Sequence, residues 1–129
     1  MARTRSRPPR DPARRAALDA LLAVETDAAY LNLIMNRLLA ERDLHGRDAA
    51  FATELAAGTG RLQGSYDLII AAASGRDLDR LDPPVRVLLR LGAHQLLSMR
   101  VPAHAAVAST VELAREAVGP KITGLVNAV

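Results

Sequence analysis

The stretch Asp82–Met99, DPPVRVLLRLGAHQLLSM, decides the fold. Its apolar side chains point in every direction around a 3.6-residue helical wheel, and a helix of that kind is a buried one. Asp82 is expected to cap the free amides of the first turn, and Pro83 suits that turn because its missing N–H would have no partner there. Gly92 predicts a close crossing by another helix, since it costs about 1 kcal/mol relative to alanine. This helix of about 16 residues, roughly 24 Å long, is predicted to be the central element of an all-helical domain.

Apolar residues recur at helical spacing on both sides of this stretch, and no strand-like alternation interrupts them. Gly58, Gly60 and Gly64 predict a kink or break in the longest periodic segment. A polar break is expected at Thr26-Asp27, and Gly119 is expected to end a helix. Besides the central helix, we expect helices over about residues 12–24, 29–42, 47–73 and 104–118, and from 120 onward.

The composition excludes several classes of protein. At 129 residues the chain has the size of one domain, which buries about two thirds of its unfolded surface. The absence of cysteine excludes disulfide frameworks and thiolate nucleophiles within these residues. The longest apolar run, Leu68–Ala73, is too short for a membrane span, and Asp19 and Glu25 interrupt the one candidate signal segment. We therefore expect a cytoplasmic protein without a membrane partner.

The positive charge is concentrated at the N-terminus. Residues 1–15 contain six arginines and one aspartate, a net charge of +5, whereas the whole chain carries +3, so residues 16–129 carry −2. Residues 1–11 lack apolar periodicity and contain a Pro-Pro pair, and we expect this arm to be disordered. Arginine suits bidentate phosphate contacts, although an arginine-rich, alanine-rich chain can equally reflect biased genome composition.

Several motifs together resemble one known family. They are Leu89-Arg90-Leu91-Gly92, Gln95-Leu96-Leu97, Pro102-Ala103-His104-Ala105-Ala106-Val107, Val111-Glu112-Leu113-Ala114 and Val126-Asn127-Ala128-Val129, with weaker matches at Asn32, Asp48, Gly58 and Arg61. As a block over about residues 12–129 they resemble the NusB-like family. More narrowly, they resemble the N-terminal NusB-like domain of bacterial small-subunit ribosomal RNA cytosine-C5 methyltransferases of the Sun/Fmu (RsmB) type.

The resemblance implies an all-α, NusB-like bundle of about six helices in two helical subdomains, divided here at about Ser74–Leu81, and an association with RNA. Family members are either free-standing antitermination factors, which bind boxA-type RNA with a ribosomal protein, or domains attached to a methyltransferase. Antitermination members tend to carry Asn-Glu where this chain has Ala108-Ser109, and an aromatic residue where it has Leu125. These departures favour the methyltransferase-domain interpretation, as does the apolar pattern that stops at Val129 as if truncated from a longer protein.

Three functions remain open at this point. The first is a non-catalytic RNA-binding domain that assists a C-terminal methyltransferase domain in cis, which would also hold the S-adenosylmethionine cofactor. The second is a free-standing antitermination factor that binds RNA with a ribosomal protein. The third is a helical docking module, a monomer or weak dimer, that binds a protein through exposed apolar surface.

The arm supplies the main candidates for contacts with RNA phosphates. Tyr30, Phe51 and Tyr66 are the only aromatic residues, and the last two fall on core-facing positions, so little base stacking is expected. Six contacts on single-stranded RNA predict a slope of log K against log salt of about −4. A solvated tail is the alternative. The candidate RNA-binding residues are Arg3, Arg5, Arg7, Arg10, Arg14, Arg15, Arg61 and Asn127.

The remaining polar candidates have structural alternatives. Arg86 and Arg90 share a face of the central helix, and they could contact phosphate or a neighbouring domain, or form ion pairs with Asp79, Asp82 or Glu112. A metal site is not expected, because the histidines lack a third ligand at suitable spacing. We expect His94 to be half-buried, His104 to bond locally at its helix start, and His45 to lie beside Asp43 and Asp48. Gly58-Thr59-Gly60 lacks the strand and spacing of a nucleotide-binding loop, so no catalytic residue is assigned.

Overall fold

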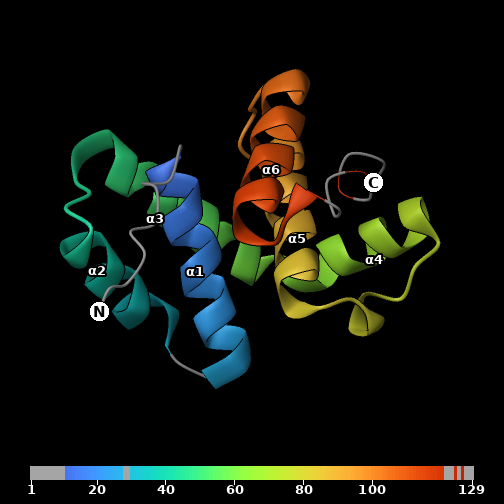
Figure 1. The fold of residues 1–129 in the computed structure, drawn as a ribbon, viewed down its shortest axis with the longest axis horizontal. Coiled ribbons are helices and arrows are strands. Elements are labelled where there is room, and N and C mark those ends of the chain that lie inside the picture. Colours follow the sequence, from blue (N-terminus) through green and yellow to red (C-terminus); the bar gives the residue numbers. More distant parts are fainter. Residues whose placement is uncertain (1–10, 28–29, 121–123, 125, 127–129) are drawn as a thin grey trace.

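The computed structural model describes residues 11–27, 30–120, 124 and 126, and this part of the chain is helical (Figure 1). No strand occurs in it, as the sequence predicts. The expected arm and most of the expected helix after Pro120 lie outside the described residues. The elements are α1 Pro12–Asp27, α2 Leu31–Glu41, α3 Gly46–Arg61, α4 Gln63–Ser74, the 3-10 turn η1 Leu78–Arg80, α5 Pro83–Leu97 and α6 Ala103–Ala117.

The observed helix boundaries follow most of the sequence signals. The predicted break in the long glycine-containing segment lies at Leu62, which has φ −103° and separates α3 from α4. Gly75 ends α4 in the left-handed conformation at φ 69°, which glycine adopts without strain. Gly119 follows the end of α6, as expected. The predicted break at Thr26-Asp27 is wrong, because α1 continues through both residues.

Helix α5 is the central element of the fold, as predicted. It packs against α1, α3, α4 and α6, and it lies between the other helices in Figure 1. Val87, Leu88 and Leu91 are completely buried in the core. The burial does not extend along the whole helix, because Leu96 and Leu97 in its last turn are exposed. A helix with apolar residues all round is therefore buried here only as far as Gln95, and its last two residues are exposed.

At two positions of α5, the atoms that make the contact are not the ones expected. Asp82 is the N-cap residue, but its side chain makes no capping hydrogen bond, and its carbonyl oxygen accepts from the backbone N–H groups of Val85 and Arg86. Gly92 does mark a close helix contact. A Cβ added there would lie 3.3 Å from Oγ1 of Thr110 on α6, so the close neighbour is a side chain.

The helices form two groups, but they divide earlier than expected. Helices α1, α2 and α3 lie together on one side of Figure 1, and α4, α5 and α6 on the other. The expected division at residues 74–81 is wrong, since α4 packs mainly on α5 and only slightly on α3. The break at Leu62 redirects the chain and places the division there. No helix within the described ranges is both long and apolar enough to cross a membrane.

Candidate functional site

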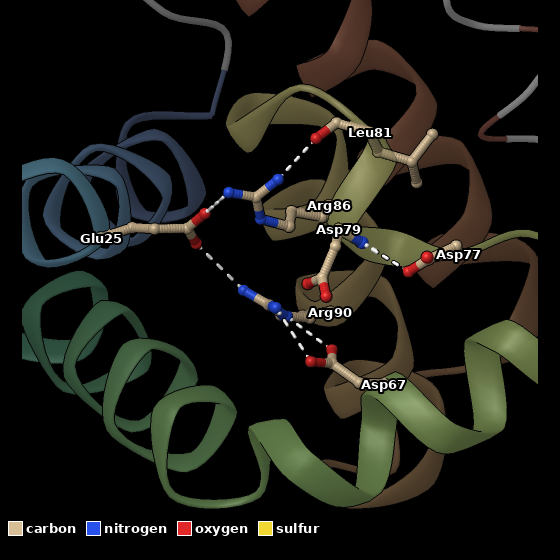
Figure 2. A network of polar contacts seen from close by, with 7 residues as sticks. All are labelled: Glu25, Asp67, Asp77, Asp79, Leu81, Arg86 and Arg90. Carbon is tan, nitrogen blue, oxygen red and sulfur yellow. Dashed lines mark hydrogen bonds and ion pairs between the residues drawn. The ribbon is translucent and has the colours of Figure 1, made fainter.

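Four charged side chains from three helices meet where the two helix groups join, and we call them the Glu25 cluster: Glu25, Asp67, Arg86 and Arg90 (Figure 2). Arg90 donates to both carboxylate oxygens of Asp67, from Nε at 2.7 Å and from Nη2 at 2.9 Å. Its Nη1 donates to Oε2 of Glu25 at 3.0 Å. Arg86 pairs with the other oxygen of Glu25 and donates to the carbonyl of Leu81. The cluster therefore links α1, α4 and α5.

The interpretation of Arg86 and Arg90 as ion-paired residues is confirmed, but the expected partners Asp79, Asp82 and Glu112 are wrong. Only 5% of Arg90 is exposed, so a phosphate could reach it only by displacing a carboxylate. Burial disfavours the charged guanidinium, but the hydrogen bonds and charges of Asp67 and Glu25 outweigh burial and raise the pKa of Arg90. Spacing along one helix could not reveal these partners, because they come from α1 and α4.

A cleft of about 520 Å³ opens beside the Glu25 cluster. Its lining includes Asp79 and the buried hydroxyl of Thr59, which has no hydrogen-bond partner among the described residues. Glu25 and Asp67 compensate the charges of both arginines. This arrangement suits an internal link between helices better than an anion-binding site.

His94 is completely buried, with 1% of its surface exposed, and the expectation of a half-buried ring is wrong. Its Nδ1 lies 2.7 Å from the hydroxyl of Tyr66, which also lies 2.7 Å from Oγ of Ser98. On the other side, Nε2 lies 3.4 Å from Oε2 of Glu54. Sequence reasoning missed this network because its partners lie 28 and 40 residues away along the chain. The ring fits only because residue 58 is glycine.

The other two histidines are exposed at helix starts. His45 precedes α3 and pairs with Asp43 at 3.3 Å, and Asp43 is one of the two aspartates expected beside it. His104 lies in the first turn of α6. The local bond expected for His104 is not among the hydrogen bonds found in residues 11–27 and 30–120. Within the same ranges, no group of three or more His, Cys, Asp or Glu residues could hold a metal ion.

The first turns of α1 hold Arg14 and Arg15 in contacts within the protein. Arg14 pairs with Asp11 at 2.7 Å, donates to Gln95 at 2.7 Å, and lies 4.7 Å from the ring centre of Phe51. Arg15 pairs with Asp19, which also pairs with Arg42. A second contact takes Arg15 to Glu116 on α6 at 3.7 Å. Both guanidinium groups therefore have carboxylate partners. Contact of Arg14 and Arg15 with RNA stays a prediction, and each guanidinium would have to bind a phosphate and its carboxylate partner at the same time.

The rest of the predicted RNA-binding set is dispersed. Arg61 is exposed in the last turn of α3. The following candidates lie outside the described residues: Arg3, Arg5, Arg7, Arg10 and Asn127. Residues 11–120 contain 12 arginines and all 14 acidic residues of the chain, so this part carries a net charge of −2. The positive charge that remains lies in residues 1–10 and at Lys121.

Two features of these residues bear on catalysis, namely the cysteine count and the position of Gly58-Thr59-Gly60. The chain has no cysteine, so the nucleophile that the family resemblance implies for cytosine-C5 methyl transfer is absent from these residues. Gly58-Thr59-Gly60 lies inside α3, and its first two residues are buried. A helix interior offers no free backbone amides to a ligand, so this tripeptide is not a nucleotide-binding loop.

Known proteins with related sequences include methyltransferases several times longer than this chain. A putative methyltransferase of Mycobacterium tuberculosis is 52% identical, and the match spans 97% of this chain but 28% of that protein. Ribosomal RNA small subunit methyltransferase B of Pseudomonas putida is 39% identical over 90% of this chain and 26% of its own length. The chain therefore spans less than a third of each of these relatives.

Solved structures with the same fold include those of the antitermination factor NusB. A chain in the crystal structure of antitermination factors NusB and NusE with double-stranded RNA matches with a TM-score of 0.82, 23% identity, and coverage of 92% of this chain and 89% of that one. The solution structure of NusB from Aquifex aeolicus matches with a TM-score of 0.76, 24% identity, and coverage of 92% and 82%. The sequence model of the NusB family matches residues 11–129. The chain thus belongs to the NusB family, as its sequence motifs and its helical fold both indicate.

Proposed function

We propose that this chain is the RNA-binding domain of a small-subunit ribosomal RNA (cytosine-C5) methyltransferase and has no part in methyl transfer itself. The observation that carries the proposal is the 52% and 39% identity to named methyltransferases over nearly the whole chain. The methyl donor and the cysteine nucleophile would then belong to a domain outside these residues. The absence of cysteine from the sequence and the helical placement of Gly58-Thr59-Gly60 support that division of roles.

The charges support a specific way of holding RNA. Within residues 11–120 the acidic residues outnumber the arginines, and the most buried arginines bind carboxylates. Residues 1–10 carry four arginines and no acidic residue. We assign the main phosphate contacts to these four, with little base recognition, because phosphate contacts need only charge and hydrogen-bond donors. The four residues are Arg3, Arg5, Arg7 and Arg10.

In this arrangement Arg14 and Arg15 fix the base of the arm. Their pairs with Asp11, Asp19 and Glu116 hold the first turns of α1 against the fold. Arg61, exposed on α3, and Asn127 stay secondary candidates. The NusB complex with double-stranded RNA also contains NusE, and binding of a ribosomal-protein partner by this chain would favour the antitermination alternative.

The test is binding of a small-subunit ribosomal RNA fragment to the native chain and to a variant in which Arg3, Arg5, Arg7 and Arg10 are all alanine. We expect the variant to bind about 100-fold more weakly at low salt, because four phosphate contacts are lost. The matched control replaces two exposed arginines of the folded part, Arg37→Ala with Arg80→Ala, and should change affinity about twofold or less. Equal affinity of the native chain and the four-alanine variant would refute the proposal.

A further inference from the structure

An apolar groove lies between α4, α5 and α6, on the opposite side of α5 from α1. Its volume is about 210 Å³ and most of its lining surface is carbon. The outer face of α4 continues the apolar surface at Leu68, which is 75% exposed. Single exposed apolar residues are ordinary, but a continuous apolar surface around a groove indicates an interaction site. The lining side chains that the argument uses are Ile69, Ala73, Leu96, Leu97, Ala106 and Val107.

The two segments that form most of this surface contain no acidic residue. Residues 68–76 carry Arg76 as their one charged side chain, and residues 91–111 carry Arg100 in addition to two histidines. Each arginine follows a groove-lining residue by three positions, Arg76 after Ala73 and Arg100 after Leu97. An apolar segment with carboxylates on its flanks would complement such a surface.

The chain itself leads into the groove. Val126, the last described residue, is buried and belongs to the groove lining. Val126 therefore tethers the residues that follow it along the chain to the neighbourhood of the groove. The named relatives have more than two thirds of their length outside the matched region. Relatives of this chain therefore contain further polypeptide that could occupy the groove. A tethered segment binds at an effective concentration of about millimolar, so even a small groove can hold it.

We propose that this α4–α6 groove docks another part of the same polypeptide, an apolar segment with acidic flanks from the domain that performs the chemistry. This inference rests on the proposed function, because it requires a longer protein that contains these residues. The docking fixes the orientation of the RNA-binding domain relative to the neighbouring domain. A free protein partner and a second copy of this chain are the other possible occupants, and the experiment separates them.

The experiment measures the accessibility of residue 97 in the full-length protein. Because the present chain has no cysteine, Leu97→Cys provides one defined thiol in it, and maleimide labelling is read at that peptide by mass spectrometry. Leu33→Cys on α2 is the matched control, since Leu33 is 62% exposed and Leu97 is 58% exposed. Each rate is divided by the rate of the same thiol in the denatured protein. We expect labelling at residue 97 to be about tenfold slower than at residue 33, at every protein concentration.

Three results would overturn the proposal. Equal normalised rates at residues 97 and 33 would show an open groove. Slow labelling at residue 97 that disappears on dilution would assign the groove to a second copy, and slow labelling that requires an added protein would assign it to a separate partner. The double variant Arg76→Glu with Arg100→Glu should restore fast labelling at residue 97, and unchanged slow labelling would refute the acidic flanks. The RNA affinity of the four-alanine variant is independent of these rates, so failure of the proposed function is recognised separately.

Discussion

Gly58 is the residue whose replacement has the most direct consequence, because the ring of His94 occupies the space beside it. A Cβ at residue 58 would lie 2.3 Å from Nε2 of His94, and this ring is buried and held by Tyr66. We expect Gly58→Ala to lower the free energy of unfolding by about 1–3 kcal/mol, since the ring cannot move without losing its hydrogen bond. Urea denaturation followed by circular dichroism would measure the change.

The control for this substitution is Gly64→Ala in α4. A Cβ at residue 64 would meet no atom within 4 Å, so alanine there adds helix propensity without a clash. We expect Gly64→Ala to leave stability unchanged or to raise it by up to about 1 kcal/mol. Equal effects of the two substitutions would contradict the packing of His94 against α3.

Arg90 tests the energetic role of the Glu25 cluster. Replacing it with methionine, Arg90→Met, keeps much of the side-chain volume but leaves Asp67 and one oxygen of Glu25 without their cation. We expect a loss of about 2–3 kcal/mol in the free energy of unfolding, below the 3–5 kcal/mol of a fully buried pair because both carboxylates keep some contact with water. The exposed pair of Arg80 and Asp77 is the control, and Arg80→Met should cost less than about 1 kcal/mol.

The pH dependence of this effect follows from the raised pKa of Arg90. A raised pKa in the folded state stabilises the protein fully below the pKa of the unfolded chain, and the contribution disappears only as the pH rises through the folded value. Both values lie far above neutral pH. The Arg90 proton contributes to the difference in free energy of unfolding between the native protein and Arg90→Met. This contribution should therefore stay constant between about pH 6 and 9.

At the scale of elements, α5 is the helix on which the others depend. Leu88 is completely buried on α5, whereas Leu33 on α2 is largely exposed. We expect Leu88→Ala to lower the free energy of unfolding by about 2–5 kcal/mol because it leaves a cavity among packed helices. The same truncation at Leu33 should change it by less than about 0.5 kcal/mol. Thermal or urea unfolding of the pair checks the difference, and similar losses at both sites would contradict the central position of α5.

The sequence predicts the elements well because each depends on local signals. The break at Leu62 follows from the nearby glycines, and the start of α5 follows from the prolines in its first turn. The prediction at Thr26-Asp27 is wrong because two polar residues do not by themselves end a helix. Helix α1 includes both of them. The division between helix groups was misplaced because it depends on which helix α4 packs against, and that is a long-range property.

At the scale of the whole molecule, local sequence features of the candidate site could be predicted, whereas contacts between distant helices could not. The family and the uneven charge can be read from the sequence itself. The partners of Arg90 and His94 could not be read, because Glu25, Asp67 and Tyr66 come from other helices. Arg14 likewise has a carboxylate partner in the folded protein, although its position beside the arm made it a candidate for phosphate. Pairing within the fold thus decides which arginines remain available to RNA.

The salt dependence of RNA binding tests the central claim most directly. If the arginines of residues 1–10 provide the contacts, four phosphates are neutralised, and log K of the native chain for a single-stranded ribosomal RNA fragment should fall with log salt at a slope of about −3. Filter binding over a series of salt concentrations gives this slope. A slope of about −3 is the result we predict, and a slope near zero would contradict the account, because RNA would then be held without the arginines of the arm.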